Sequence, residues 1–165
     1  RHTPRRSVTL QNMTEGSPSL ILYLDKDDYR ALHAYLAERS LQDGEPIPPF
    51  EHAGEGDLDA LIKTPQASYF GQEVYPTLEE KAAIILYTIN KKQIFLNGNK
   101  RMSTLSLLVF LGINGKMLGV TPDALTAKAL WLANTTSLEF PAIKEDLVRW
   151  IRDHVKDVPF PAVPL

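Results

Sequence analysis

The chain has 165 residues, of which 44% are hydrophobic and 23% are charged, and its formal net charge is −2. This length suits one domain with a single core, and the small charge excludes bulk attraction to nucleic acid or to an anionic membrane surface. The absence of cysteine excludes disulfides and thiolate chemistry and favours a cytoplasmic location, and no apolar run approaches the roughly 20 residues of a membrane span.

The first third of the chain predicts two helices separated by irregular segments. Residues 1–18 are polar and aperiodic and predict a loose arm, and the apolar run over 20–24 predicts a strand or an edge segment. Apolar residues at helical spacing behind an acidic start predict a helix over 27–39. A loop rich in proline and glycine follows over 41–56, before a short helix over 57–63 whose first residue, an aspartate, is expected to cap it.

The rest of the chain predicts longer helices. An extended turn or small hairpin is predicted over 66–76, where aromatic residues precede a glycine. Thr77 is followed three residues later by a glutamate, the spacing of a capping box, which opens a helix to about residue 92. Further helices are predicted over 100–114, 122–133 and 139–155. The expected fold class is therefore all-α, with one helical domain over 19–157 and a short tail over 158–165.

A polar segment, Asn97-Gly98-Asn99-Lys100-Arg101 (the NGNKR segment), separates two of the predicted helices. The first N–H groups of the second helix lack intrahelical partners and attract anions. Gly98 lets the backbone approach a ligand or adopt a positive φ, Asn97 or Asn99 can cap the helix, and the two cations add donors. These features predict a cradle for phosphate or another polyanion. An ordinary turn between antiparallel helices explains the same residues equally well, since short anion-cradle patterns often arise by chance.

The longer segment QIFLNGNKR, over residues 93–101, resembles the motif of the Fic/Doc (Fido) family, and most of all that of its Doc branch. That motif has the form His-x-Phe-x-(Asp/Asn)-(Gly/Ala)-Asn-Lys-Arg. Phe95 matches its aromatic position, which would anchor the loop, and an apolar helix that ends in Asn114-Gly115 follows, as in the family. The resemblance extends roughly over residues 20–150. It implies a compact α-helical bundle of the Fic/Doc type, with a small extended flap before the motif helix.

Family members bind a nucleoside triphosphate at this motif and transfer a phosphate or an AMP to a hydroxyl of a target protein. The resemblance therefore implies ATP or another nucleoside triphosphate as the donor. The residues that would hold its phosphates are Asn97, Gly98, Asn99, Lys100 and Arg101. The position of Asn97 is acidic in many members and faces a metal there, so the resemblance also implies Mg²⁺, for which an amide is a weaker ligand.

Two partners follow from the same resemblance. The segment before the Thr77 helix corresponds to the flap that aligns a target protein by strand-like pairing, with a simple surface turn as the alternative. The flap residues are Ser68, Tyr69, Phe70, Gly71 and Gln72. Doc-type proteins are restrained by a separate antitoxin, which is therefore the second implied partner. Neither a membrane nor nucleic acid is expected to bind.

The family's catalytic histidine falls on Gln93 in this chain. Imidazole titrates near neutral pH and takes the proton of the attacking hydroxyl, whereas an amide does not titrate. A general-base contribution of about 10²- to 10⁴-fold is therefore expected to be missing. The histidines of the chain are His2, His33, His52 and His154. None of them is close to the motif in sequence, and a structural role is predicted for His33 and a solvent-exposed loop position for His52.

Three interpretations stay open at this point. The chain is a toxin-type transferase of phosphate or AMP that Gln93 impairs or inactivates, or a pseudoenzyme that binds a nucleotide or a partner without catalysis. The third interpretation is a plain helical interaction domain, in which the NGNKR segment is only a turn. The glutamine is either natural or an inactivating substitution.

Overall fold

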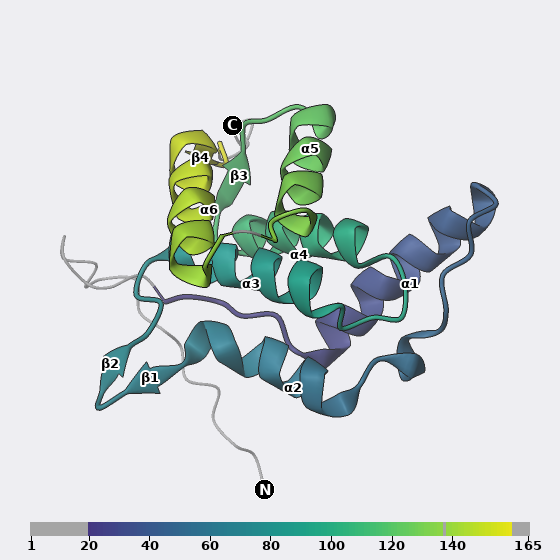
Figure 1. Ribbon diagram of the computed structural model, residues 1–165, viewed down its shortest axis with the longest axis horizontal. Helices are drawn as coiled ribbons and strands as arrows, with labels where there is room; N and C mark the ends of the chain where they lie inside the picture. Colours follow the sequence, from purple (N-terminus) through teal and green to yellow (C-terminus); the bar gives the residue numbers. More distant parts are fainter. Residues whose placement is uncertain (1–19, 137, 160–165) are drawn as a thin grey trace, which may run out of the picture.

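A computed structural model describes residues 20–136 and 138–159, and in this part of the chain six α-helices form a bundle (Figure 1). The helices are α1 (Lys26–Gln42), α2 (Glu55–Lys63), α3 (Leu78–Lys92), α4 (Asn99–Ile113), α5 (Pro122–Ala133) and α6 (Phe140–His154). The strands are β1 (Ser68–Tyr69), β2 (Gln72–Glu73), β3 (Lys116–Leu118) and β4 (Val155–Asp157). Two short 3-10 turns are η1 (Phe50–His52) and η2 (Thr64–Gln66). The all-α expectation is confirmed, while the predicted arm and most of the predicted tail lie outside the described residues.

Helices α3 and α4 form the centre of the bundle, with α5 and α6 on one side of the pair and α2 on the other (Figure 1). The predicted capping box opens α3: Thr77 Oγ1 accepts from the Glu80 N–H at 3.1 Å, and the Thr77 N–H donates to the Glu80 carboxylate at 3.3 Å. Nine of the 15 residues of α3 are buried. A helix covered on most sides belongs to the core, so its two ends are held in fixed positions.

Helix α2 begins at Glu55, two residues before the predicted start. Gly54 is its N-cap, and the Leu58 N–H already donates to the Gly54 carbonyl at 2.9 Å. The prediction that Asp57 caps this helix is therefore wrong, because the backbone is helical before the aspartate is reached.

Of the two alternatives predicted over 20–24, the strand does not form. Within the described part of the chain this segment pairs with no strand, and one side chain at the end of α4 bonds instead to the backbone of Leu22. The Leu22 N–H donates to Asn114 Oδ1 and Asn114 Nδ2 donates to the Leu22 carbonyl, both at 2.9 Å. A side-chain amide thus supplies the pair of hydrogen bonds that a neighbouring strand would make.

Two antiparallel strand pairs complete the described fold. The predicted hairpin is confirmed, with Tyr69 opposite Gln72 and positive φ angles of 48° at Phe70 and 75° at Gly71, as a two-residue type I′ turn requires. The second pair, β3 with β4, was not predicted, and α6 ends at His154 rather than at residue 155. None of the helices in the described part of the chain combines the length and apolar character that crossing a membrane requires.

Candidate functional site

The connection between α3 and α4 contains two residues in the left-handed region. Gln93 ends α3 with φ 49° and ψ 56°, and Gly98 precedes α4 with φ 76°. A Cβ atom on Gly98 would lie 3.4 Å from Cγ2 of Ile47, which belongs to the segment after α1. At that distance a Cβ would make an ordinary contact, so glycine is favoured at position 98 by its positive φ alone, and the predicted positive φ is confirmed.

The side chain of Asn99 holds this loop together. Its Oδ1 accepts from the Phe95 N–H at 2.9 Å, and its Nδ2 donates to the Phe95 carbonyl at 2.7 Å. Asn97 makes only a local contact, in which its Oδ1 accepts from the adjacent Gly98 N–H at 2.7 Å. Neither asparagine caps α4, so that prediction is wrong: both amides satisfy the loop rather than the helix.

Phe95 is buried and anchors the loop between α3 and α4 in the core. Its ring centroid lies 5.4 Å from that of His33 on α1 and 6.1 Å from that of Phe50 in η1. His33 is buried as well, which confirms the structural role predicted for it. Burial lowers the pKa of His33 below its ordinary value of 6.5, and the nearby charge of Glu51 partly offsets this effect.

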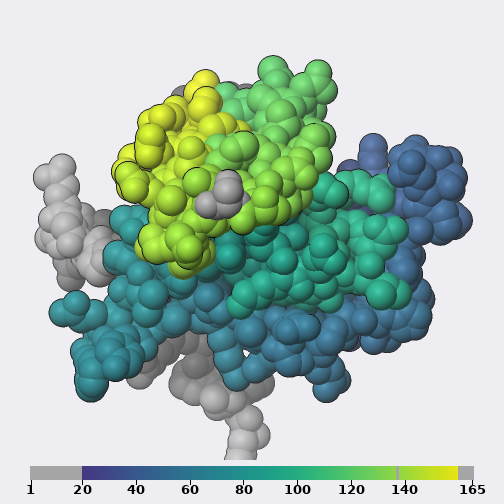
Figure 2. Space-filling model, viewed as in Figure 1, coloured from purple at the N-terminus to yellow at the C-terminus, as the bar shows by residue number. Residues whose placement is uncertain are grey.

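A hollow of about 560 Å³ opens at the NGNKR segment. Figure 2 shows this teal-green region below the green surface of α5 and beside the blue surface of α1 and the segment that follows it. The residues that line the hollow are Asn90, Lys91, Gln93, Leu96, Asn97, Gly98, Asn99, Lys100, Arg101, Thr126 and Ala133. The structure thus brings all five predicted phosphate-binding residues together with Gln93, in a volume within the range of small-molecule sites.

The hollow is rich in hydrogen-bond donors at the start of α4. The first backbone bond of this helix runs from the Met102 N–H to the Gly98 carbonyl at 2.8 Å, which leaves the N–H groups of residues 99–101 without intrahelical partners. Lys100 is exposed. Arg101 is half-buried, and its Nη1 donates to Ser40 Oγ at the end of α1, 2.7 Å away. The partial positive charge of the helix end and these two cations favour an anionic ligand.

The same lining does not suit a metal ion. None of the residues around the hollow is an Asp, a Glu or a His, and Oδ1 of Asn97, the expected ligand, already accepts from Gly98. Across the described ranges no group of three His, Asp or Glu residues is close enough to hold an ion. Mg²⁺ sites normally use one or two carboxylates. The residues present therefore do not fit a dedicated Mg²⁺ site.

No histidine or carboxylate among the described residues lines the hollow. His33 is buried against Phe95, His154 lies at the end of α6, and His52 is exposed in η1; none of these three described histidines lines the hollow. Glu51 is engaged by Arg30 at 2.9 Å. Gln93, which the resemblance places at the histidine position, lines the hollow with an amide that can accept a hydrogen bond but not a proton.

The flap does not lie at the hollow. The hairpin β1–β2 is next to the N-terminal end of α3, whereas Gln93 is at its C-terminal end (Figure 1). A helix of 15 residues is about 22 Å long, so roughly that distance separates the two predicted parts of the site. The tip is exposed, with 71% of Tyr69 and 90% of Phe70 accessible.

A buried lysine holds the base of this hairpin. Lys81 Nζ donates to the Glu73 carboxylate at 3.0 Å and to the Pro65 carbonyl at 3.1 Å, and it lies 5.6 Å from the ring centroid of Tyr23. Only 1% of the Lys81 side chain is accessible, against 51% for Glu73. The hairpin therefore has an exposed tip and an anchored base.

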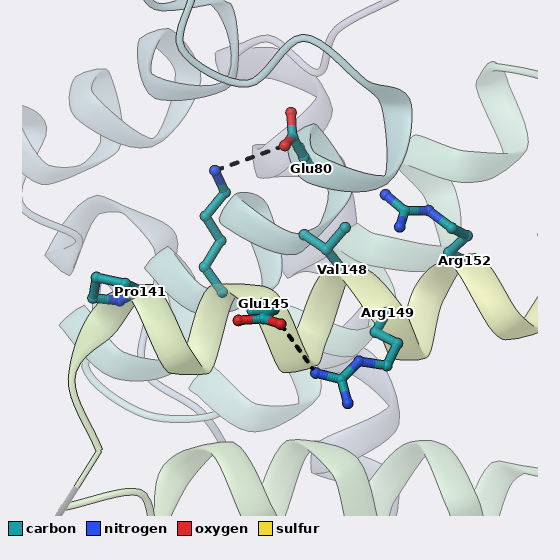
Figure 3. A pocket seen from close by; sticks show the side chains of 7 residues that line it. Glu80, Pro141, Glu145, Val148, Arg149 and Arg152 are labelled. Atoms are coloured by element: carbon teal, nitrogen blue, oxygen red, sulfur yellow. Dashed lines mark hydrogen bonds and ion pairs between the residues drawn. The ribbon is translucent and has the colours of Figure 1, made fainter.

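A second hollow, of about 410 Å³, lies between α6 and the start of α3 (Figure 3). Two of its three cations face carboxylates of the same wall: Lys144 lies 3.8 Å from Glu80, and Arg149 lies 3.5 Å from Glu145, whereas Arg152 has no ion pair with a described residue. Because these charges are largely neutralised within the wall, this hollow is a weaker candidate for an anion than the one at α4.

Five lining residues were not predicted from the sequence. They are Asn90, Lys91, Leu96, Thr126 and Ala133. Asn90 had a detectable signal, because it follows the buried Leu86 by four residues and so falls on the apolar face of its helix. Thr126 and Ala133 come from α5, far away in sequence, and nothing local connects them with the motif.

We compared the sequence of this chain with protein families and with individual proteins of known name. The model of the Fic/DOC family matches residues 23–111, which is more than half of the chain and includes the whole NGNKR segment. A protein named Toxin Doc, from Mycolicibacterium smegmatis, is 37% identical over 75 residues. That alignment covers 46% of this chain and 58% of the relative, so the similarity spans less than two thirds of the relative's length.

Proposed function

Because the chain belongs to the Fic/DOC family, we propose that it is a Doc-like protein that binds a nucleoside triphosphate at the NGNKR segment and acts as an impaired transferase. The transferred group would be a phosphate or an AMP, and the acceptor a hydroxyl of a target protein. The observation that carries this proposal is the donor-rich hollow at the N-terminus of α4, which matches the anionic end of such a ligand.

In the proposed reaction the acceptor oxygen forms a bond to phosphorus. The bond to the leaving group breaks, releasing ADP when a phosphate is transferred or pyrophosphate when AMP is transferred. The N–H groups of residues 99–101, with Lys100 and Arg101, stabilise the charge on the phosphates. No step is assigned to a metal ion.

Gln93 limits the proposed reaction. Its carbonyl oxygen can accept a hydrogen bond from the acceptor hydroxyl and orient it, but the proton must then leave to water. We expect a loss of about 10²- to 10⁴-fold relative to a histidine at this position. Residual transfer is compatible with a loose transition state, in which positioning and charge stabilisation dominate.

The partners are part of the proposal. The relative named Toxin Doc supports a toxin-type role with a separate antitoxin as the restraining partner, in the cytoplasm where nucleoside triphosphates are found. An extended target segment that paired with β1–β2 would need about seven residues to reach Gln93 along α3.

A nucleotide-binding pseudoenzyme is the second candidate. The observation that favours it is the absence of a His, Asp or Glu side chain among the described residues that line the hollow. In that case the hollow binds ATP, and the chain transfers nothing even when a histidine is restored.

The decisive experiment compares the chain with its Gln93→His variant. Both are incubated with ATP and candidate target proteins, and adducts are identified by intact mass, which separates phosphate from AMP. We expect adducts with Gln93→His at a rate at least about 100-fold above that of the parent chain. Binding without adducts in either form supports the pseudoenzyme.

Calorimetric titration with ATP tests the cradle itself. We expect Lys100→Ala to weaken binding about tenfold or more, because a charge-assisted hydrogen bond to phosphate is lost. Lys92→Ala is the matched control, since Lys92 is also exposed but does not line the hollow. If ATP does not bind at all, the NGNKR segment is only a turn and the proposal fails.

A further inference from the structure

Arg101, in the first turn of α4, is held by an uncharged side chain of another helix. Its Nη1 donates to Oγ of Ser40 in the last turn of α1, 2.7 Å away and 61 residues earlier in the chain. The guanidinium makes no other hydrogen bond and no ion pair with a described residue. A guanidinium carries five N–H donors, so most of them are left for a ligand in the hollow that Arg101 lines.

Ser40 is buried and belongs to a helix end that is itself fixed. Only 1% of the residue is accessible, and it is not among the residues that line the hollow. Two backbone hydrogen bonds close the end of α1: the Glu45 N–H donates to the Ser40 carbonyl at 2.8 Å, and the Gly44 N–H donates to the Leu41 carbonyl at 3.2 Å. The hydroxyl of Ser40 therefore has a defined position and one charged partner, Arg101.

The chemistry of this partner leaves the positive charge of Arg101 available. A carboxylate in the place of Ser40 would also hold the guanidinium, but its negative charge would repel a phosphate in the hollow. A hydroxyl accepts the same hydrogen bond without a charge, and the end of α1 adds only the partial negative charge of the helix dipole. A long, flexible side chain is thus ordered before a ligand arrives, which lowers the entropic cost of binding.

We propose that Ser40 is a positioning residue that orients Arg101 for the phosphates of the nucleotide. The ligand then meets a guanidinium that is already ordered, beside the N–H groups at the start of α4. The role of Ser40 makes the end of α1 part of the phosphate site, although the sequence motif does not include it. This inference rests on the nucleotide binding proposed above.

The test is a double-mutant cycle on the full chain, in which calorimetry measures ATP binding to the parent, to Ser40→Ala, to Arg101→Ala and to the double variant. We expect Ser40→Ala to weaken binding about fivefold where Arg101 is present, the value of ordering one long side chain, and to change nothing where it is alanine. An effect of Ser40 on the fold alone would be the same in both backgrounds. Tripolyphosphate should show the same loss as ATP, because Arg101 is expected to bind phosphates and not the nucleoside.

Two further substitutions serve as controls. Ser40→Thr keeps the hydroxyl and is expected to bind ATP as the parent chain does. Ser106 of α4 is also a buried serine, but it does not line the hollow, and its Oγ bonds to none of the described residues. Ser106→Ala is therefore expected to leave the affinity unchanged. If Ser40→Ala does not fold, Ser40→Cys replaces it, since a thiol fills nearly the same space and is a weak acceptor.

Several results would overturn the role of Ser40 and leave the phosphate cradle intact. They are an unchanged affinity in Ser40→Ala, equal losses in the two backgrounds, equal losses in Ser40→Ala and Ser40→Thr, and a loss for ATP without one for tripolyphosphate. If Arg101→Ala abolishes measurable binding, the comparison of Ser40→Ala with Ser40→Thr decides. If ATP does not bind the parent chain, the proposed function fails, and the role of Ser40 fails with it.

Discussion

The two asparagines that flank Gly98 have the same side chain but different contacts. Asn99 bonds twice to the backbone of the buried Phe95, whereas Asn97 is exposed and bonds only to the next residue. The side chain of Asn99 therefore supports the loop, and in the proposed nucleotide binding only its backbone N–H at the start of α4 would contact the ligand.

We expect Asn99→Ala to lower the free energy of unfolding by about 1–3 kcal/mol, because two hydrogen bonds of partly buried backbone groups are lost. Asn97→Ala is the matched control, with an expected change within about 0.5 kcal/mol. Urea unfolding of both variants measures the difference. Equal effects of the two substitutions would show that the loop does not depend on Asn99.

At the residue scale the sequence predicted the backbone of Gly98 and the burial of Phe95 better than the hydrogen bonds within the loop. The positive φ of Gly98 and the buried anchor at Phe95 followed from residue type and motif position. The role of Asn99 could not be predicted in this way. An asparagine beside the start of a helix suggests a helix cap, whereas its side chain bonds to the backbone of Phe95, four residues earlier. Asn90 was missed because its partners belong to α4 and α5, which only the tertiary fold brings to it.

The hairpin β1–β2 is an element whose stability depends on an asymmetric ion pair. Lys81 is buried while half of Glu73 is accessible to water. Removal of the glutamate therefore leaves a buried charge without its counter-ion, whereas removal of the lysine leaves a carboxylate that water can solvate.

We accordingly expect Glu73→Ala to lower the free energy of unfolding by about 3 kcal/mol, and Lys81→Met to lower it by about 1 kcal/mol. Glu38→Ala, at an exposed site on α1, is the control, with an effect within about 0.5 kcal/mol. Chymotrypsin cleavage at the exposed Tyr69 and Phe70 should accelerate in Glu73→Ala. A larger loss in Lys81→Met than in Glu73→Ala would contradict this reading of the pair.

For the whole molecule, a buried histidine couples the stability of the single core to pH. The pKa of His33 is lowered mainly by burial, so the unfolded chain takes up this proton first as the pH falls. The stability that neutral His33 provides is fully present above pH 6.5, the ordinary value, and decreases as the pH falls below it.

We expect urea unfolding to show a free energy that declines between pH 7 and pH 5, with a smaller decline in the His33→Gln variant. The comparison is between the two slopes, because other groups titrate in both proteins and the substitution also changes packing. Identical slopes would show that His33 is not the group responsible.

Most of the helical architecture could be predicted because its signals are local. Thr77 caps the helix that its spacing predicted, and α5, whose N-cap is Thr121, has the predicted bounds. Two contacts could not be predicted: the strand pair β3–β4 and the hydrogen bonds between Leu22 and Asn114. Each joins segments that are far apart in the chain through only two or three residues. Pairings of this kind are decided by how the helices pack.

The left-handed backbone at Gln93 also bears on how readily this chain could change in evolution. Histidine is among the residues enriched in that region of the φ/ψ map, so the turn favours a histidine at least as well as the glutamine it holds. Either glutamine codon becomes a histidine codon through a single third-position change. Lineages of this protein can therefore lose or regain the proposed base by one nucleotide substitution, without rebuilding the fold around it.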